Sequence, residues 1–363
     1  MAITKIPAAG FTGNNFRNII INGDMSIAQR GTSTASITSA GYYACDRWKF
    51  QPDSLGTWTM SQDTDVPSGQ GFAKSTKLDC TTANGSPSAG SSLTLIQSIE
   101  GQNLQYLKKG SANAESLTVS FWVKSNKTGT YIIEFYDADN ARSISRAYTI
   151  DSASTWEKKT VTIPGDTSGT LGNDNGGSFE CTWWLGAGTN FTSGTLQTSW
   201  SSQNNANRAV GQVNLADDTA NEWFITGVQL EAGTTASDFE FLPYDVNLRR
   251  CQRYYYKVID VPGGDADGYF ATGYLYSSNR LYFWIPLGIQ MRASPTLESA
   301  SGTNYYIFYR DGTNDDFNTI ISTQMRNRGC MLRSDDTHIS GTAGQAGGIH
   351  STANSKVAFS SEL

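Results

Sequence analysis

Aromatic rings with short polar side chains nearby are the residues of this chain that suggest a chemistry. Saccharides present C–H faces that stack on aromatic rings, and their hydroxyl groups form hydrogen bonds with amide, carboxylate and guanidinium groups. The candidate carbohydrate-binding residues are Trp58, Trp122, Trp183, Trp184, Asn173 and Asp174. For any single tryptophan the alternative is ordinary packing in a core. Trp122 is the best platform candidate, because alternation along its strand puts Leu117, Val119 and Phe121 on the opposite face.

A second kind of chemistry is suggested by the turn Asp137-Ala-Asp-Asn140, which is rich in side-chain oxygens. Such oxygens are the ligands of hard cations, so Asp137 and Asp139 are the candidate metal ligands and a structural Ca²⁺ is the candidate cofactor. The spacing does not match an EF-hand loop. A solvated acidic turn is the alternative.

Catalytic chemistry is not indicated, and no catalytic residue is predicted. The paired carboxylates Asp315-Asp316 and Asp335-Asp336 are adjacent in sequence, and adjacent residues of a strand point to opposite faces. The chain has two histidines, and neither a GxSxG nor an HExxH motif occurs. We therefore expect a binding protein that breaks no bond.

The composition of the chain limits the kinds of partner that it can bind. The 27 basic and 33 acidic residues give a formal net charge of −6, without the basic footprint of a nucleic-acid binder. The sequence shows no signal-peptide pattern and no apolar run long enough to span a membrane, so we expect no membrane insertion. The five cysteines show no CxxC spacing and are expected to be buried free thiols, in a protein made in the host cytoplasm.

The elements that must position these residues are β-strands. Gly, Ser, Thr and Asn are abundant, and strand patterns recur at roughly ten-residue spacing without helices between them, which is typical of an antiparallel sandwich or jelly roll. Residues 221–231 alternate apolar and polar side chains, so we predict the closing strand of the sandwich there, with Phe224, Thr226, Val228 and Leu230 on one buried face. Further strands are predicted over residues 57–60, 75–80, 92–100, 117–123, 131–135, 156–163 and 179–187. Asp46 and Arg47, beside Trp48, are interpreted as a buried ion pair.

The order of these patterns predicts an all-β chain with three parts. An N-terminal arm would cover residues 1–17, a large jelly-roll sandwich residues 18–245, and a smaller C-terminal β-domain residues 246–363. The C-terminal part would open with a short helix from Asp245 to Tyr255. It is rich in aromatic side chains, which would form either a subunit interface or a ligand site: Tyr274, Tyr276, Tyr282, Trp284, Tyr305, Tyr306 and Tyr309.

Several local motifs resemble bacteriophage and prophage tail-fibre proteins. They are residues 18–23, 29–31, 46–48, 163–169, 184–188, 207–215, 225–231, 251–255 and 291–296. The resemblance implies a receptor-binding virion protein with a jelly roll similar to carbohydrate-binding modules, assembled as a homotrimer. It also implies host surface polysaccharide or lipopolysaccharide as the ligand, and attachment to other virion tail proteins through the N-terminal arm. The alternative is a structural virion component, an adaptor or a head or tail decoration that binds no receptor.

Overall fold

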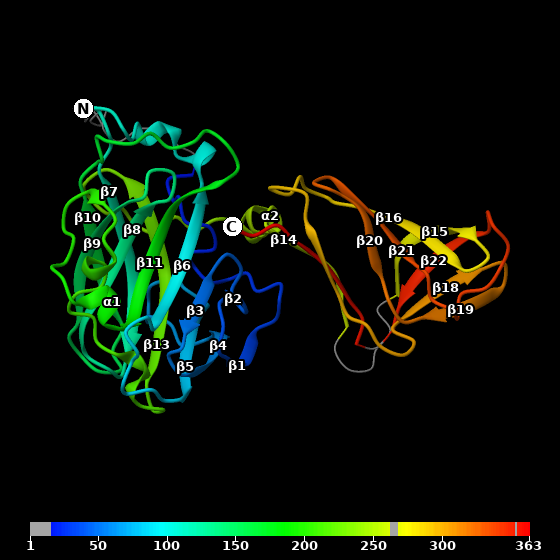
Figure 1. The fold of residues 1–363 in the computed structure, drawn as a ribbon, viewed down its shortest axis with the longest axis horizontal. Helices are drawn as coiled ribbons and strands as arrows, with labels where there is room; N and C mark the ends of the chain where they lie inside the picture. The colour runs from blue at the N-terminus through cyan, green and yellow to red at the C-terminus, as the bar shows by residue number, and fades with distance from the viewer. Residues whose placement is uncertain (1–15, 262–267, 353) are drawn as a thin grey trace, which may run out of the picture.

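The computed structural model describes residues 16–261, 268–352 and 354–363 of the chain. Strands dominate, every strand pairing is antiparallel, and two β lobes lie on either side of a short helix (Figure 1). This confirms the expected all-β class: a large jelly-roll sandwich, then a short helix and a smaller β region. The arm predicted over residues 1–17 lies outside the described residues except for Phe16 and Arg17.

The first lobe is a sandwich of two sheets. The six-stranded sheet has the order β1 (Ser33–Ile37), β4 (Thr57–Asp63), β5 (Ser75–Thr82), β13 (Glu222–Ala232), β7 (Leu117–Ser125) and β10 (Glu157–Ile163). The seven-stranded sheet has the order β12 (Ser201–Ser202), β9 (Arg142–Ile150), β8 (Gly129–Asp137), β11 (Gly177–Ala187), β6 (Ser92–Glu100), β3 (Lys49–Asp53) and β2 (Gly41–Tyr42).

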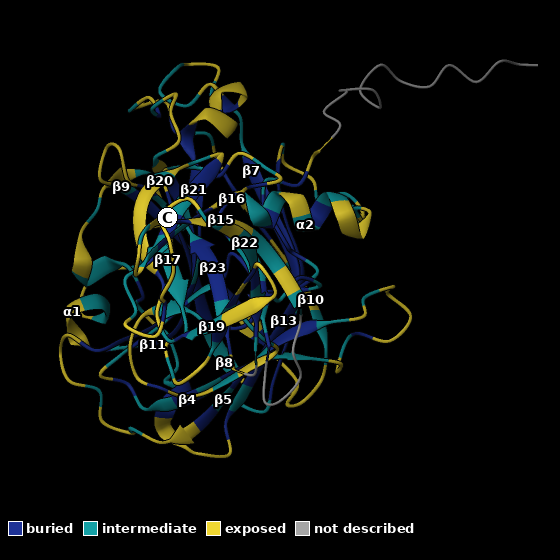
Figure 2. Cartoon of the chain, turned by 90° about the vertical axis from the view of Figure 1, so that its right-hand side faces the viewer, coloured by how far each residue is buried: buried dark blue, intermediate teal, exposed yellow. Residues whose placement is uncertain are grey.

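The space between these sheets holds the larger hydrophobic core. Alternate residues of β7 enter it: Val119, Phe121 and Val123 have no exposed surface. Strand β8 contributes Tyr131, Ile133 and Phe135 in the same way. In Figure 2 buried residues run through the middle of the molecule, whereas exposed residues mark mainly the loops and outer edges.

Strand β13 is central rather than terminal in its sheet, and its side chains change faces halfway along. Its register with β7 shifts between Thr226 and Gln229, and Gly227 adopts a φ of 62° at that point. Such a bulge reverses the alternation of side chains. Ile225 and Val228 therefore both enter the core, while Phe224 packs at 6.1 Å from Trp156 on the outer face. The prediction of a single buried face from Phe224 to Leu230 is wrong for this reason.

The second lobe contains two smaller sheets. One has the order β14 (Tyr255–Asp260), β23 (Lys356–Ser360) and β17 (Thr296–Ser299). The other has the order β19 (Thr313–Phe317), β18 (Tyr306–Arg310), β22 (Ala346–Ser351), β15 (Gly268–Ser277), β16 (Arg280–Pro286), β21 (Gly329–Ser334) and β20 (Ile321–Arg326). Together they enclose a core that includes Leu281, Phe283 and Phe359.

The helix between the lobes is α2 (Tyr244–Gln252), and it spans the domain boundary predicted at residues 245 and 246. It starts within one residue of the prediction but ends earlier, because Tyr255 begins strand β14. Cys251 packs with Tyr254 against Ile21 and Ile27 of the first lobe. All five cysteines are free and buried, which confirms that prediction. None of the described helices is long and apolar enough to cross a bilayer.

Candidate functional site

The structure places two of the predicted sugar-binding tryptophans inside the sandwich. Trp58 has no exposed surface, and its Nε1 donates to the Leu55 carbonyl at 2.7 Å. Trp183 is equally buried, with its ring 5.5 Å from that of Trp48. No ligand at the surface reaches either ring, so core packing replaces the platform role that the sequence suggested.

Trp184 points to the other face of β11 and is also covered. The loop excursion from Gly188 to Asp218, which includes α1 (Thr189–Thr192), lies over it: Phe191 packs at 5.2 Å, and the Arg208 guanidinium stands 5.0 Å from the ring centroid. The Trp184 Nε1 donates to Glu134 at 3.1 Å. With 1% of its surface exposed, this ring is a structural residue of the outer face.

Trp122 stays accessible in part. It is half-buried on the outer face of the six-stranded sheet, opposite Lys158 of β10 and Thr226 of β13. The placement agrees with the face predicted from its strand. No other predicted site residue lies on these three strands.

The polar candidates Asn173 and Asp174 are exposed in the loop between β10 and β11. Asp174 Oδ1 accepts from the Gly176 backbone N–H at 2.8 Å, and its carbonyl accepts from the Gln102 backbone N–H at 2.9 Å. The loop therefore supports a short turn at the end of β6, although neither residue joins a tryptophan of the predicted set.

The two candidate metal ligands have protein partners. Asp137 is fully buried and accepts hydrogen bonds from Lys109 Nζ and from Asn140, so an ammonium group supplies the positive charge there. Asp139 accepts instead from the Gly172 backbone N–H at 2.8 Å. Among the described residues no three His, Cys, Asp or Glu side chains are placed to hold a metal ion.

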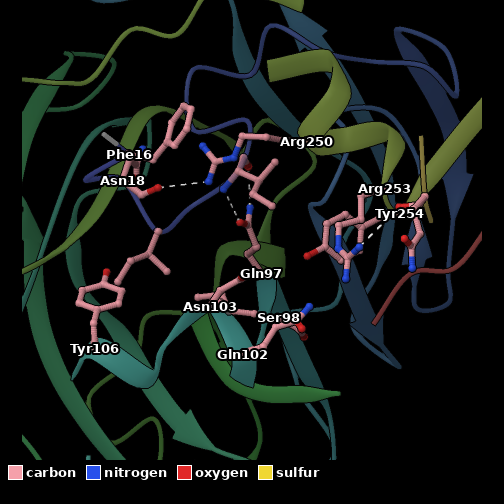
Figure 3. A pocket seen from close by; sticks show the side chains of 14 residues that line it. Phe16, Asn18, Gln97, Ser98, Gln102, Asn103, Tyr106, Arg250, Arg253 and Tyr254 are labelled. Atoms are coloured by element: carbon pink, nitrogen blue, oxygen red, sulfur yellow. Dashed lines mark hydrogen bonds between the residues drawn. The ribbon is translucent and has the colours of Figure 1, made fainter. Parts of the chain in front are cut away.

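A groove at the junction of the two lobes is the strongest candidate site. It has a volume of about 550 Å³. Figure 3 shows its lining, which comes from residues 16–21, the end of β6, the 3-10 turns η2 (Gly101–Asn103) and η3 (Gln105–Leu107), α2 and the residues after it, and Gln290. The residues lie far apart in the sequence, so only the fold brings them together.

One side of the groove is held rigid by hydrogen bonds. The Gln97 amide bonds both ways with the Ile21 backbone, at 2.7 and 2.9 Å. Nearby, the fully buried Glu100 accepts from Arg253 through Nε and Nη2, each at 2.7 Å, and from the Tyr254 hydroxyl at 2.5 Å. Burial raises the pKa of Glu100, but these hydrogen bonds outweigh it and the net shift is downward.

The junction is also closed by the last residues of the chain. Glu362 pairs with Arg30 at 3.1 Å and with the buried Arg47. Asp46 instead accepts from Gln29. The expected Asp46–Arg47 pair is therefore wrong: the two residues lie in a turn in which Arg47 has a φ of 73°, and each side chain finds a partner elsewhere.

The other side of the groove offers groups that remain open to a ligand. Tyr106 is 38% exposed and presents its ring, and burial of its lower part raises the pKa of its hydroxyl to about 12. Gln102 and Asn103 are exposed on η2; the Gln102 Nε2 donates to Glu100 at 2.5 Å, so Asn103 is the amide that stays open. Across the groove stands the Arg250 guanidinium (Figure 3). An aromatic ring with an amide and a cation beside it suits a hydroxyl-rich ligand.

Sequence reasoning missed this site. Gln102, Asn103 and Tyr106 lie in a short connection after β6 that carries no strand or helix pattern. In the sequence they form only a tyrosine among amide side chains in a turn. Because that pattern is common at protein surfaces, it does not identify a site.

The outer face of the larger sheet of the second lobe is a second exposed feature. Tyr269, Tyr274, Tyr276, Trp284 and Tyr309 are 37–65% exposed there. Tyr269 lies over Gly348, where an added Cβ would come within 2.5 Å of the ring. Of the other aromatic residues named from the sequence, Tyr282 packs 5.5 Å from Tyr276, whereas Tyr306 is fully buried and Tyr305 packs against the core.

Comparisons with known proteins add likeness of fold only. No family model and no curated protein matches the sequence. A tailspike domain of bacteriophage CBA120, described as enzymatically active, is 16% identical with a TM-score of 0.31, over 60% of this chain and 21% of that one. A carbohydrate-binding module solved with β-1,4-galactotriose is 12% identical with a TM-score of 0.31, over 60% of this chain and 99% of the module. A sugar-binding protein described as putative, from Bacteroides thetaiotaomicron, is 13% identical with a TM-score of 0.34, over 59% of this chain and 99% of its own. Matches with TM-scores this low carry no argument about function.

Proposed function

We propose that this chain binds glycans without cleaving them, and that the groove at the junction of the lobes is the binding site. The observation that supports this most directly is the groove's chemistry: the exposed Tyr106 ring, the open amide of Asn103 and the Arg250 guanidinium face one space. The described lining contains no Asp, Glu, His or Cys, so it offers no carboxylate, imidazole or thiolate for acid–base or nucleophilic catalysis.

The biological setting of the proposal comes from the resemblance of the sequence to phage tail fibres. In that setting the chain is a virion receptor-binding protein, and its ligand is host surface polysaccharide or lipopolysaccharide met during adsorption. Contacts to other tail proteins would be made through the N-terminal arm.

The Tyr106→Ala variant tests the site. We expect it to weaken binding about tenfold, because a stacked aromatic contact contributes roughly 1 kcal/mol or more beyond its buried area. Binding is measured by isothermal titration against a panel of purified bacterial surface polysaccharides, with the folded state checked by circular dichroism. Trp122→Ala is the matched control, because Trp122 lies on the outer face of the six-stranded sheet, outside the groove. This variant is expected to bind as the wild type does.

The outcome locates the site in either case. Loss of binding in Trp122→Ala with normal binding in Tyr106→Ala would move the glycan to the six-stranded sheet. A folded protein that binds no polysaccharide of the panel would favour the alternative of a structural virion component.

A second proposed role, assembly into a homo-oligomer, is favoured by the aromatic face of the second lobe. Five large rings exposed on one sheet exceed the scattered apolar residues normal for a monomer surface. Aromatic residues are enriched in the buried centres of interfaces. We propose that copies of this chain cover the face, and the resemblance makes the expected state a trimer.

Sedimentation velocity tests the assembly. The wild type is expected to sediment as an oligomer. The double variant Tyr276→Glu, Trp284→Glu is expected to sediment as a monomer at the same concentration, because burying an unpaired charge at an interface is strongly unfavourable. Tyr244→Glu is the control, because Tyr244 is 63% exposed, like Tyr276 at 62%, but belongs to α2. A wild type that stays monomeric at tens of micromolar would assign this face to another ligand.

A further inference from the structure

Arg250 differs from Arg253, Arg30 and Arg47, three other arginines at the junction, in having no acidic partner. Arg253 is bonded to Glu100 at 2.7 Å, and both Arg30 and Arg47 are bonded to Glu362. Among the described residues no carboxylate lies within 4.0 Å of the Arg250 guanidinium. The charges of these three arginines are therefore neutralised within the fold, and Arg292 spends its donors on backbone carbonyls, whereas Arg250 has neither kind of compensation in full.

The donors of Arg250 are largely unused. A guanidinium carries five N–H groups. One of the Arg250 donors, Nη2, reaches the Asn18 carbonyl at 3.2 Å, and the Phe16 ring lies 5.7 Å from Cζ. No other hydrogen bond of this side chain is formed within the described residues. Its remaining donors are available to whatever enters the groove.

The surroundings offset the charge of Arg250 only in part. Glu240 is the carboxylate whose charge acts on Arg250, but it forms no ion pair with it, and its Oε2 accepts from the Asn18 backbone N–H at 2.9 Å. Burial lowers the pKa of Arg250, whereas hydrogen bonds to Glu100 raise that of Arg253. An arginine stays protonated through such shifts, so a half-buried positive charge remains in the groove wall.

We propose that Arg250 binds an anionic substituent of the glycan, a carboxylate or a phosphate, so that the preferred ligand is an acidic polysaccharide. The proposal rests on the function proposed above and names the ligand class of the same groove. The planar guanidinium fork matches both groups and can bond to either through two parallel hydrogen bonds. Tyr106 and Asn103, across the groove, would hold the sugar ring that carries the charge (Figure 3).

The net charge of the chain indicates that binding of an acidic glycan would depend on a local contact. At −6 the protein as a whole repels a polyanion, so a preference for an acidic glycan would have to arise from a local contact. Such a contact is sensitive to one substitution, whereas a diffuse electrostatic attraction would be shared among many residues.

The test treats each polysaccharide that binds in three forms: native, with its carboxyl groups reduced to alcohols by carbodiimide and borohydride, and with its phosphates removed by hydrofluoric acid. We expect one of the two treatments to weaken binding to the wild type about tenfold or more, and which one does so identifies the group. Arg250→Gln should bind native and treated forms alike, at the level of the treated form on the wild type. Arg250→Lys should keep part of the preference.

Arg249→Gln is the matched control, since Arg249 is the exposed neighbour on α2 and does not line the groove. It should behave as the wild type. Equal binding of all three forms by the wild type would overturn the anionic subsite and leave glycan binding intact. Arg250→Gln that loses native and treated forms equally would show a structural role instead. No binding of any form by folded protein would overturn both proposals.

Discussion

The Glu100→Gln variant is expected to lose roughly 3 kcal/mol of unfolding free energy, because it removes one partner of a buried ion pair. Glu100 is fully buried and receives hydrogen bonds from Arg253 and Tyr254 across the junction of the lobes. The value is taken at the low end of the roughly 3–5 kcal/mol range for such pairs, since Arg253 is 27% exposed and can regain water. Urea unfolding of both proteins gives the difference.

The same pair makes the difference depend on pH. The folded-state pKa of Glu100 lies below its ordinary value of 4.5, so the unfolded chain takes up the proton first as the pH falls. The stabilisation is therefore fully present above about pH 5.5 and disappears as the pH falls through the lowered folded pKa. Wild type and Glu100→Gln should converge in acid.

Glu115→Gln is the control for this prediction. Its pair with Lys108 is exposed, with side-chain exposures of 40% and 55%, and its loss should cost less than about 1 kcal/mol at any pH. If Glu100→Gln unfolded at the same urea midpoint as the wild type, the stability of the junction would not depend on this carboxylate.

The Trp183→Ala variant is expected to lose roughly 4 kcal/mol, because removing a fully buried aromatic side chain leaves a cavity. Its ring contacts those of Trp48 and Phe121, at 5.5 and 5.7 Å, so neighbours from both sheets of the sandwich lose a contact. Thermal and urea unfolding measure the loss.

Trp122→Ala is the matched comparison, since Trp122 is half-buried on an outer face, and its loss should be less than half as large. If Trp183→Ala kept its stability and lost glycan binding, the ring would be a ligand contact and its burial in this structure would not describe the binding state.

Much of the fold was predictable from alternation of side chains. Strand β6 has the predicted limits, and β7 and β8 extend their predicted spans by a few residues, because each places apolar side chains on one face at every second position. Strand β9 was missed because Arg146 interrupts the apolar face formed by Ile144, Tyr148 and Ile150, which weakens the alternation. The reversal within β13 depends on a bulge at Gly227, which no alternation pattern shows.

The candidate site was less predictable because it depends on what covers each residue. Trp183 and Trp184 look equivalent in the sequence, yet one faces the core and the other is covered by the loop excursion after β11. The groove needs η2, α2 and residues 16–21 in one place, and no spacing in the sequence connects them. Asp137 was predicted as a metal ligand on an oxygen-rich turn, and the structure places it buried beside the Lys109 ammonium group.

The return of Glu362 to the first lobe has a mechanical consequence. The second lobe is connected to the sandwich through α2 and β14 and, in parallel, through β23 and the residues after it, and β14 and β23 are paired with each other. A load applied to the far sheet divides between these two connections, one covalent through α2 and the other held by the contacts of Glu362 and Leu363 with the first lobe. A force on the second lobe would therefore be transmitted to the groove, because α2 and the residues after it belong both to the first connection and to the groove lining.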